Sequence, residues 1–217
     1  MLNRDTDVLL VIDVQNDFCP GGALAVNEGD QIVPLINRLL QAFTHSVLTQ
    51  DWHPPGHSSF ASSHADAAPF STRKMPYGEQ TLWPDHCVQG TDGARFHPYL
   101  ATDRAELIIR KGFRQAIDSY SAFFENDRQT ATGLAGYLRE RGFQRLFLTG
   151  LATDYCVAWS ALDGCQQGFE VVLIEDACRA INLDGSLARA KAELRAAGVQ
   201  FCSSEAIYNK SERRESV

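Results

Sequence analysis

Short apolar runs, separated by segments with helical periodicity, are the feature that most restricts how this chain can fold. The runs are brief, rich in leucine and β-branched residues, and bounded by polar residues or glycine, as buried strands are. Nearly continuous apolar character is typical of parallel strands in a sheet that is covered on both faces. The runs lie at residues 8–12, 46–49, 146–149 and 171–174, with weaker candidates at 106–110 and 199–202.

Helical patterns occupy the intervals between these runs. Apolar residues recur at helical spacing in residues 30–43, and further helices are expected at 133–141, 154–167 and 187–197. Alternation of strand and helix predicts a three-layer α/β/α fold around a mostly parallel open sheet, with right-handed crossovers. A length of 217 residues fits a single domain that covers residues 1–217.

Charge and cysteine content exclude several classes of protein. The net charge is −7, and no basic stripe with interleaved aromatic residues occurs, so we expect no nucleic-acid partner. The apolar run near the start of the chain is too short for a membrane span, and no cleavage site follows it. None of the six cysteines belongs to a CxxC pair. We therefore expect a cytoplasmic protein with reduced thiols and no membrane partner.

Cys156 is a candidate nucleophile. It follows the strand expected at 146–149, and Thr153 is suited to cap a helix whose first turn would contain the thiol. The helix dipole and the free N–H groups of that turn would favour the reactive thiolate and could stabilise an oxyanion. The alternative is that Cys156 only fills the core, as most buried free cysteines do.

Asp13 and Lys111 end two other expected strands. A carboxylate that interrupts an apolar run is partly desolvated, which makes Asp13 a candidate proton acceptor for a thiol. Lys111 could keep Asp13 ionised and favour a thiolate at Cys156. Taken singly, Asp13 could instead cap a loop and Lys111 could be a surface residue. Because the carboxyl ends of parallel strands open onto one crevice, we expect the three residues to meet there.

The long segment at residues 52–99 has no strand or helix pattern but contains candidate metal ligands. Asp51 and His53 are two apart on an extended segment and point to one side, and His86 adds a second imidazole. Two imidazoles and one carboxylate suit Fe(II), Mn(II) or Zn(II) and leave positions open. The alternative is a set of exposed loop histidines. Nearby candidates for a fourth ligand or a supporting contact are His57, Ser59 and His64.

Six stretches, taken together and in order, resemble those of bacterial nicotinamidases (pyrazinamidases) within the isochorismatase-like cysteine hydrolases. They lie at residues 12–26, 50–54, 83–88, 111–112, 118–123 and 150–157. The resemblance runs from about residue 8 to residue 202 and implies the isochorismatase-like fold. It also implies conversion of nicotinamide, and of pyrazinamide, to the acid and ammonia in NAD salvage. The expected partner is a small aromatic amide.

The resemblance implies roles for individual residues. The catalytic triad would be Asp13, Lys111 and Cys156, and one divalent metal ion would be held by the ligands Asp51, His53 and His86. Some members of the family have a fourth protein ligand where this chain has Ser59, so Ser59, His57 and water all stay open. A cis peptide bond is implied between Leu151 and Ala152, with an oxyanion hole made by the N–H groups of Ala152 and Cys156. Ring contacts would come from Phe18, Trp83 and Tyr120, with Leu24 and Val26 nearby.

Two other interpretations of the sequence stay open. A metal-free relative, such as an isochorismatase or an amidase acting on carbamoyl compounds, would not need the Asp51, His53 and His86 set. A non-catalytic protein that kept the fold would be expected to lack a member of the triad. The identity of the metal, the preference among aromatic amides and the formation of a homo-oligomer are not fixed by the sequence.

Overall fold

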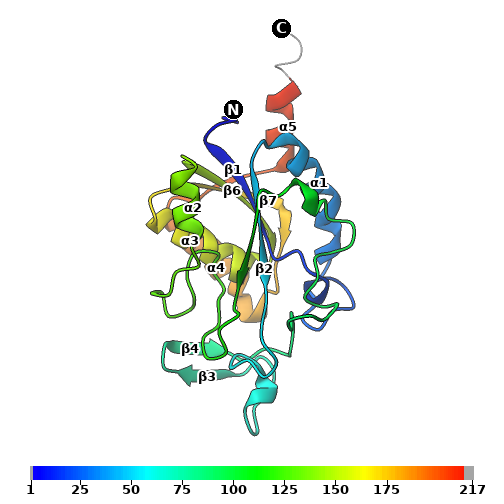
Figure 1. Ribbon diagram of the computed structural model, residues 1–217, viewed down its shortest axis with the longest axis vertical. Helices are drawn as coiled ribbons and strands as arrows, with labels where there is room; N and C mark the ends of the chain where they lie inside the picture. The colour runs from blue at the N-terminus through cyan, green and yellow to red at the C-terminus, as the bar shows by residue number, and fades with distance from the viewer. Residues whose placement is uncertain (1, 213–217) are drawn as a thin grey trace.

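A six-stranded sheet forms the centre of the computed structural model, which describes residues 2–212 (Figure 1). The strand order is β5-β2-β1-β6-β7-β8, and every neighbouring pair in it is parallel. This arrangement confirms the predicted fold class. The strands are β1 (Asp7–Ile12), β2 (Ser46–Asp51), β5 (Leu107–Lys111), β6 (Arg145–Leu151), β7 (Glu170–Arg179) and β8 (Gln200–Cys202).

Helices cover both faces of this sheet. In Figure 1, α1 and α5 lie on one side, and α2, α3 and α4 lie on the other. Among residues 2–212, no helix combines the length and apolar character that a membrane crossing needs. The helices are α1 (Val33–Ala42), α2 (Leu134–Glu140), α3 (Ala158–Gln166), α4 (Ser186–Ala196) and α5 (Ser204–Glu212).

Burial follows the apolar patterns of the sequence. Every residue of β1 is buried, and α1 packs its buried stripe, which includes Ile36 and Leu39, towards the sheet. Each fully buried side chain of this kind contributes roughly 1.5–3 kcal/mol. The edge strand β5 is different because its residues alternate between partial burial and exposure, and only its last residue, Lys111, is fully buried. The weak apolar signal of this strand in the sequence follows from its position at the edge.

Three features differ from the sequence-based prediction. The segment at 52–99 contains an antiparallel hairpin of β3 (Thr72–Met75) and β4 (Gly78–Thr81), which is mostly exposed and therefore carries no apolar alternation. The helix expected from residue 154 begins instead with a π-helical turn at Thr153–Val157. The helix α5 was not predicted, because its pattern is short and polar.

Gly150 allows β1 and β6 to approach closely at the end of the sheet that carries the candidate site. Its φ is +120°, and a Cβ atom placed there would lie 2.1 Å from the carbonyl oxygen of Ile12. Any larger residue would push β6 away from β1, just before the segment that leads to Cys156.

We expect Gly150→Ala to lower the free energy of unfolding by about 2–4 kcal/mol, because the methyl group overlaps the Ile12 carbonyl and φ is unfavourable. The matched control is Gly136→Ala in α2, where an added Cβ has no neighbour within 4 Å. Urea unfolding followed by circular dichroism measures both variants. Equal stability of the two would contradict the close approach of these strands.

Candidate active site

The carboxyl ends of four neighbouring strands bring the predicted residues together. Asp13 directly follows β1, Asp51 ends β2, Lys111 ends β5, and Cys156 lies in the π-helical turn after β6. All four are buried. The predicted convergence on one crevice is thus present in the structure.

Lys111 links the nucleophile to the candidate metal ligands. Its Nζ lies 2.8 Å from Asp13 Oδ2 and 3.1 Å from Asp51 Oδ1. It also donates to the carbonyl oxygen of Ser119 at 2.8 Å and lies 3.5 Å from Cys156 Sγ. Burial opposes the charge of Lys111, but Asp13 and Asp51 outweigh it and raise its pKa well above the ordinary value. The amine is therefore a permanent positive charge inside the site.

Asp13 is prepared to accept a proton. Its Oδ1 accepts a hydrogen bond from Thr49 Oγ1 at 2.6 Å, and its own N–H donates to the same hydroxyl at 3.1 Å. Its Oδ2 faces Lys111 without a well-aligned hydrogen bond. Burial raises the pKa of Asp13 although Lys111 opposes the shift. A carboxylate with a raised pKa is a stronger base than an ordinary one.

Burial opposes the ionisation of Cys156, an effect that the sequence does not show. From the sequence, the helix N-terminus and Lys111 are expected to favour a thiolate. In the structure, burial raises the pKa of Cys156 well above the ordinary value, Lys111 lowers it only in part, and a hydrogen bond to Asp13 raises it further. This direction favours the thiol form of the candidate nucleophile, which a base such as Asp13 would activate.

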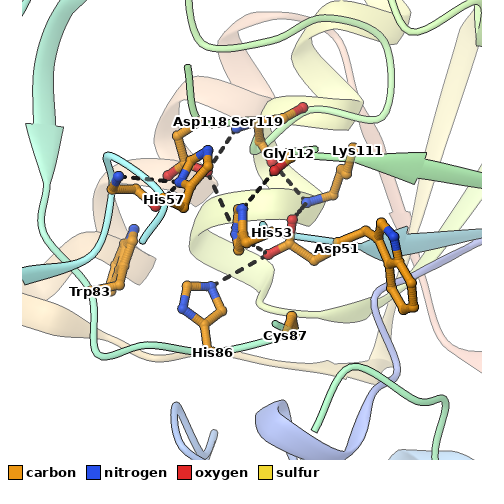
Figure 2. Close-up of polar contacts among 12 residues, drawn as sticks. Asp51, His53, His57, Trp83, His86, Cys87, Lys111, Gly112, Asp118 and Ser119 are labelled. Atoms are coloured by element: carbon orange, nitrogen blue, oxygen red, sulfur yellow. Dashed lines mark hydrogen bonds and ion pairs between the residues drawn. The ribbon is translucent and has the colours of Figure 1, made fainter. Parts of the chain in front are cut away.

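Asp51, His53 and His86 form a compact buried group, which Asp51 connects to Lys111 (Figure 2). Asp51 Oδ2 lies 3.0 Å from His53 Nε2 and 3.4 Å from His86 Nε2. In each imidazole Nδ1 faces a carbonyl oxygen at 2.8 Å, that of Gly112 for His53 and that of Pro84 for His86. Because a carbonyl can only accept, Nδ1 carries the proton and Nε2 points at Asp51.

This donor set fits a divalent metal ion. His53 Nε2 is buried and has no well-aligned hydrogen bond, so it is open to either a metal ion or a second proton. An imidazole that donates Nδ1–H to a carbonyl and presents Nε2 is the usual arrangement of a histidine ligand. Two imidazoles and a carboxylate suit zinc, iron or manganese.

Gly112 has an importance to the site that its sequence pattern does not reveal. Its φ is +67°, and an added Cβ would lie 2.6 Å from His53 Cε1 and 2.9 Å from Asp51 Oδ1. Its carbonyl also fixes the tautomer of His53. The chain can pass this close to the ligands only because the residue after Lys111 has no side chain.

His57 and His64, the other histidines considered as ligands, form hydrogen bonds with groups outside the Asp51, His53 and His86 set. His57 Nε2 faces the carbonyl oxygens of Arg114 and Ile117 at 2.9 and 3.2 Å, and its Nδ1 lies 2.7 Å from Ser59 Oγ. His64 Nε2 donates to the Ser58 carbonyl at 2.8 Å. Both nitrogens of His57 are therefore engaged in hydrogen bonds, Nε2 with the two carbonyl oxygens and Nδ1 with Ser59.

Two polar residues after β1 hold the ligands in place and were not singled out from the sequence. Gln15 donates to the carbonyl oxygen of Asp51 and accepts from its N–H, both at 2.8 Å. Asp17 accepts from the N–H of Cys87 at 2.7 Å, directly after His86. Both are polar residues that follow a fully buried strand, which is the signal that could have identified them.

A pocket opens between the nucleophile and the ligand group. Four of the five expected ring contacts line this pocket. The fifth, Val26, is buried but does not line the pocket, and its N–H donates to the carbonyl oxygen of Phe18 at 3.1 Å. Residues that the sequence did not suggest as ring contacts are Tyr155, Ile181 and Asp118. The full lining is Phe18, Leu24, Asp51, Trp83, His86, Asp118, Tyr120, Ala152, Tyr155, Cys156 and Ile181.

The backbone beside Cys156 has the cis peptide bond that the resemblance implied, between Leu151 and Ala152. The carbonyl oxygen of Ala152 accepts the N–H groups of Tyr155 and Val157, each at 3.1 Å. These two hydrogen bonds fix the start of the π-helical turn next to the nucleophile, with Ala152 itself on the pocket wall.

Metal affinity is expected to rise with pH. Burial opposes protonation of His53, but Asp51 outweighs it and raises the pKa of His53 to about 9. Below that pH a metal ion must displace a proton from Nε2, so the apparent affinity for zinc should increase by about tenfold per pH unit between pH 6.5 and 8.5. Competition with a chromophoric chelator measures this slope. An affinity that does not change with pH would contradict the assignment of His53 as a ligand.

The family match, the sequence relatives and the solved structures all place this chain in one family. Residues 7–206 match the isochorismatase domain. A nicotinamidase of Acinetobacter baylyi is 56% identical over 207 residues, which cover 95% of this chain and 97% of the relative. The structure of an Acinetobacter baumanii nicotinamidase/pyrazinamidase has a TM-score of 0.93 at 53% identity and covers 94% of this chain and 98% of that one. A pyrazinamidase of Pyrococcus horikoshii in complex with zinc has a TM-score of 0.74 at 36% identity and covers 91% and 98%. The chain therefore belongs to the isochorismatase family and is a homologue of its nicotinamidases.

Proposed function

We propose that this chain is an amidohydrolase that converts nicotinamide and water to nicotinate and ammonia, in NAD salvage. The observation that carries the proposal is the buried contact of Lys111 with Asp13, Asp51 and Cys156 beside an aromatic pocket. A nicotinamidase that is 56% identical over nearly the whole chain supports the same substrate. Pyrazinamide, a flat ring with the same carboxamide, is a second expected substrate.

In the proposed mechanism Asp13 removes the proton from Cys156, and the thiolate attacks the carboxamide carbon. The N–H groups of Ala152 and Cys156 stabilise the oxyanion of the tetrahedral intermediate. Asp13 returns the proton to the leaving nitrogen, so that ammonia departs and a thioester remains. Asp13 then takes a proton from water, and the resulting hydroxide attacks the thioester. The Cys156 thiolate leaves and regains a proton from Asp13, and the nicotinic acid that forms loses its own proton to solvent and departs as nicotinate. Lys111 balances the negative charge throughout.

We propose that Asp51, His53 and His86 hold one divalent metal ion, with zinc, iron and manganese as candidates. A bound ion would supply a Lewis-acidic contact for the ring nitrogen of the substrate and so orient the ring. A zinc complex of a related pyrazinamidase supports this part of the proposal. Water is the proposed fourth ligand, because His57 has both nitrogens engaged and Ser59 faces His57.

The ring of the substrate is proposed to lie between the aromatic residues of the pocket. Trp83 and Tyr155 meet edge to face with ring centroids 4.9 Å apart, and Tyr120 meets Trp83 at 6.2 Å. Phe18 and Leu24 complete the apolar wall. Val26 would act indirectly by supporting Phe18.

Three further expectations stay predictions. The single central sheet is compatible with one domain over residues 1–217. All six cysteines are free, which suits the cytoplasmic location expected from the sequence. The expectation that the protein has no nucleic-acid or membrane partner also stays a prediction.

Replacement of the nucleophile tests the reaction directly. We expect Cys156→Ala to reduce ammonia release from nicotinamide by at least about 10³-fold, because Cys156 is the thiol that lines the pocket and lies 3.5 Å from Lys111 Nζ. The matched control is Cys165→Ala in α3, a half-buried cysteine outside the pocket, which should keep activity within about twofold. Ammonia release measures both. Full activity in Cys156→Ala would refute the assignment.

Removal of the metal separates this proposal from a metal-free relative of the family. We expect a strong chelator to reduce nicotinamide hydrolysis by at least about tenfold, because the ring would lose its anchor. Adding back zinc, iron(II) or manganese one at a time should restore activity and identify the working ion. Unchanged activity after chelation, with no metal in elemental analysis, would favour the metal-free alternative.

A further inference from the structure

Gln80 is a buried amide on an otherwise exposed hairpin. In β3 and β4 the side chains are exposed or half-buried, except that of Gln80, which is 1% exposed. A buried amide is costly unless its donors and acceptor are all satisfied, so its partners are informative. The catalytic scheme uses none of the hairpin residues.

Two of the partners of Gln80, Asp118 and Tyr120, line the substrate pocket. Its Nε2 donates to Asp118 Oδ2 at 2.7 Å and to Tyr120 Oη at 2.8 Å, and lies 2.8 Å from the carbonyl oxygen of Thr81. Its Oε1 accepts from Asn126 Nδ2 at 3.1 Å. Asn126 in turn accepts the backbone N–H of Tyr120 at 2.9 Å. The two amides therefore hold Tyr120 at both its backbone and its hydroxyl group.

The hydroxyl group of Tyr120 in turn holds the indole ring of Trp83 in place. The indole Nε1–H of Trp83 donates to the hydroxyl of Tyr120 at 3.0 Å, and the two rings meet at an interplanar angle of 74°. Both residues line the pocket. If the hydroxyl of Tyr120 were free to move, the buried indole N–H would lose its acceptor and the angle between the two rings would no longer be fixed.

We propose that Gln80 is a positioning residue that sets the aromatic wall of the substrate pocket through the hydroxyl group of Tyr120. This inference rests on the proposed function. It assigns Gln80 to the binding of the flat ring and not to bond cleavage, because none of its side-chain partners belongs to the triad. These partners are Tyr77, Asp118, Tyr120, Asn126 and a backbone carbonyl.

The metal ligands should not depend on Gln80. Asp118 approaches the ligand group with Oδ1, which lies 3.9 Å from His53 Nε2 (Figure 2). That oxygen accepts the N–H of Ser119 at 2.8 Å, whereas Gln80 binds Oδ2. Loss of Gln80 therefore leaves Asp118 held on the side of the metal ligands.

The test is Gln80→Leu, which keeps the side-chain volume and removes both donors and the acceptor. We expect KM for nicotinamide to rise roughly tenfold, as for a lost buried hydrogen bond, with kcat within about threefold of wild type. The Kd of nicotinamide, measured by calorimetry in a Cys156→Ala background, should rise by a similar factor. Metal content by elemental analysis should be unchanged. The matched control is Glu79→Ala on the exposed side of the same strand, for which no change is expected.

A double-mutant cycle shows whether Gln80 acts through Tyr120. In a Tyr120→Phe background, Gln80→Leu should change KM by less than about twofold, because the hydroxyl that it holds is gone. If Gln80→Leu does not fold, Gln80→Glu replaces it, since it has the same size and lacks both donors. Additive effects in the cycle, or a fall in kcat with unchanged KM and Kd, would overturn the proposal. Absence of ammonia release from wild type would instead refute the proposed function.

Discussion

The site depends on one buried ion-pair network centred on Lys111. An amine without exposed surface would be strongly destabilising by itself, and here it is offset by two carboxylates and a carbonyl oxygen within 3.1 Å. Asp51 and Lys111 are direct neighbours in the pairing of β2 with β5, while Asp13 directly follows β1, the next strand along. The sheet register thus places one cation between the carboxylate beside the nucleophile and the carboxylate beside the imidazoles.

This network explains why two kinds of chemistry occupy one crevice. On one side, burial leaves Cys156 as a thiol and Asp13 as a base with a raised pKa. On the other side, backbone carbonyls direct the Nε2 atoms of His53 and His86 towards Asp51. Under the proposed function, the substrate is a flat ring that spans the two sides of the crevice. Its ring nitrogen faces the metal ligands and its carboxamide faces the triad, so both groups contribute to recognition.

Much of this arrangement could be predicted from the sequence because it follows from local pattern and parallel topology. Apolar runs located the central strands, and the convergence of carboxyl ends in a parallel sheet is enough to predict that Asp13, Lys111 and Cys156 meet. The hairpin of β3 and β4 was not predicted, because its exposed strands have no alternation of apolar and polar residues. The role of Gln80 depends on hydrogen bonds to residues 38 and more positions away, which no local pattern encodes. The helix N-terminus and Lys111, which favour a thiolate at Cys156, are visible in the sequence, whereas the degree of burial, which raises the pKa of that thiol, is not.

The central claim is that Cys156 rests as a buried thiol, beside an ionised Asp13 whose charge Lys111 balances. The rate of iodoacetamide alkylation at Cys156, followed by peptide mass spectrometry from pH 6 to pH 10, tests it most directly. The account predicts a rate that still increases above pH 9, since burial raises the pKa of Cys156 well above the ordinary 9.0. A rate that is already constant below pH 7 would mean a resting thiolate and would contradict the account.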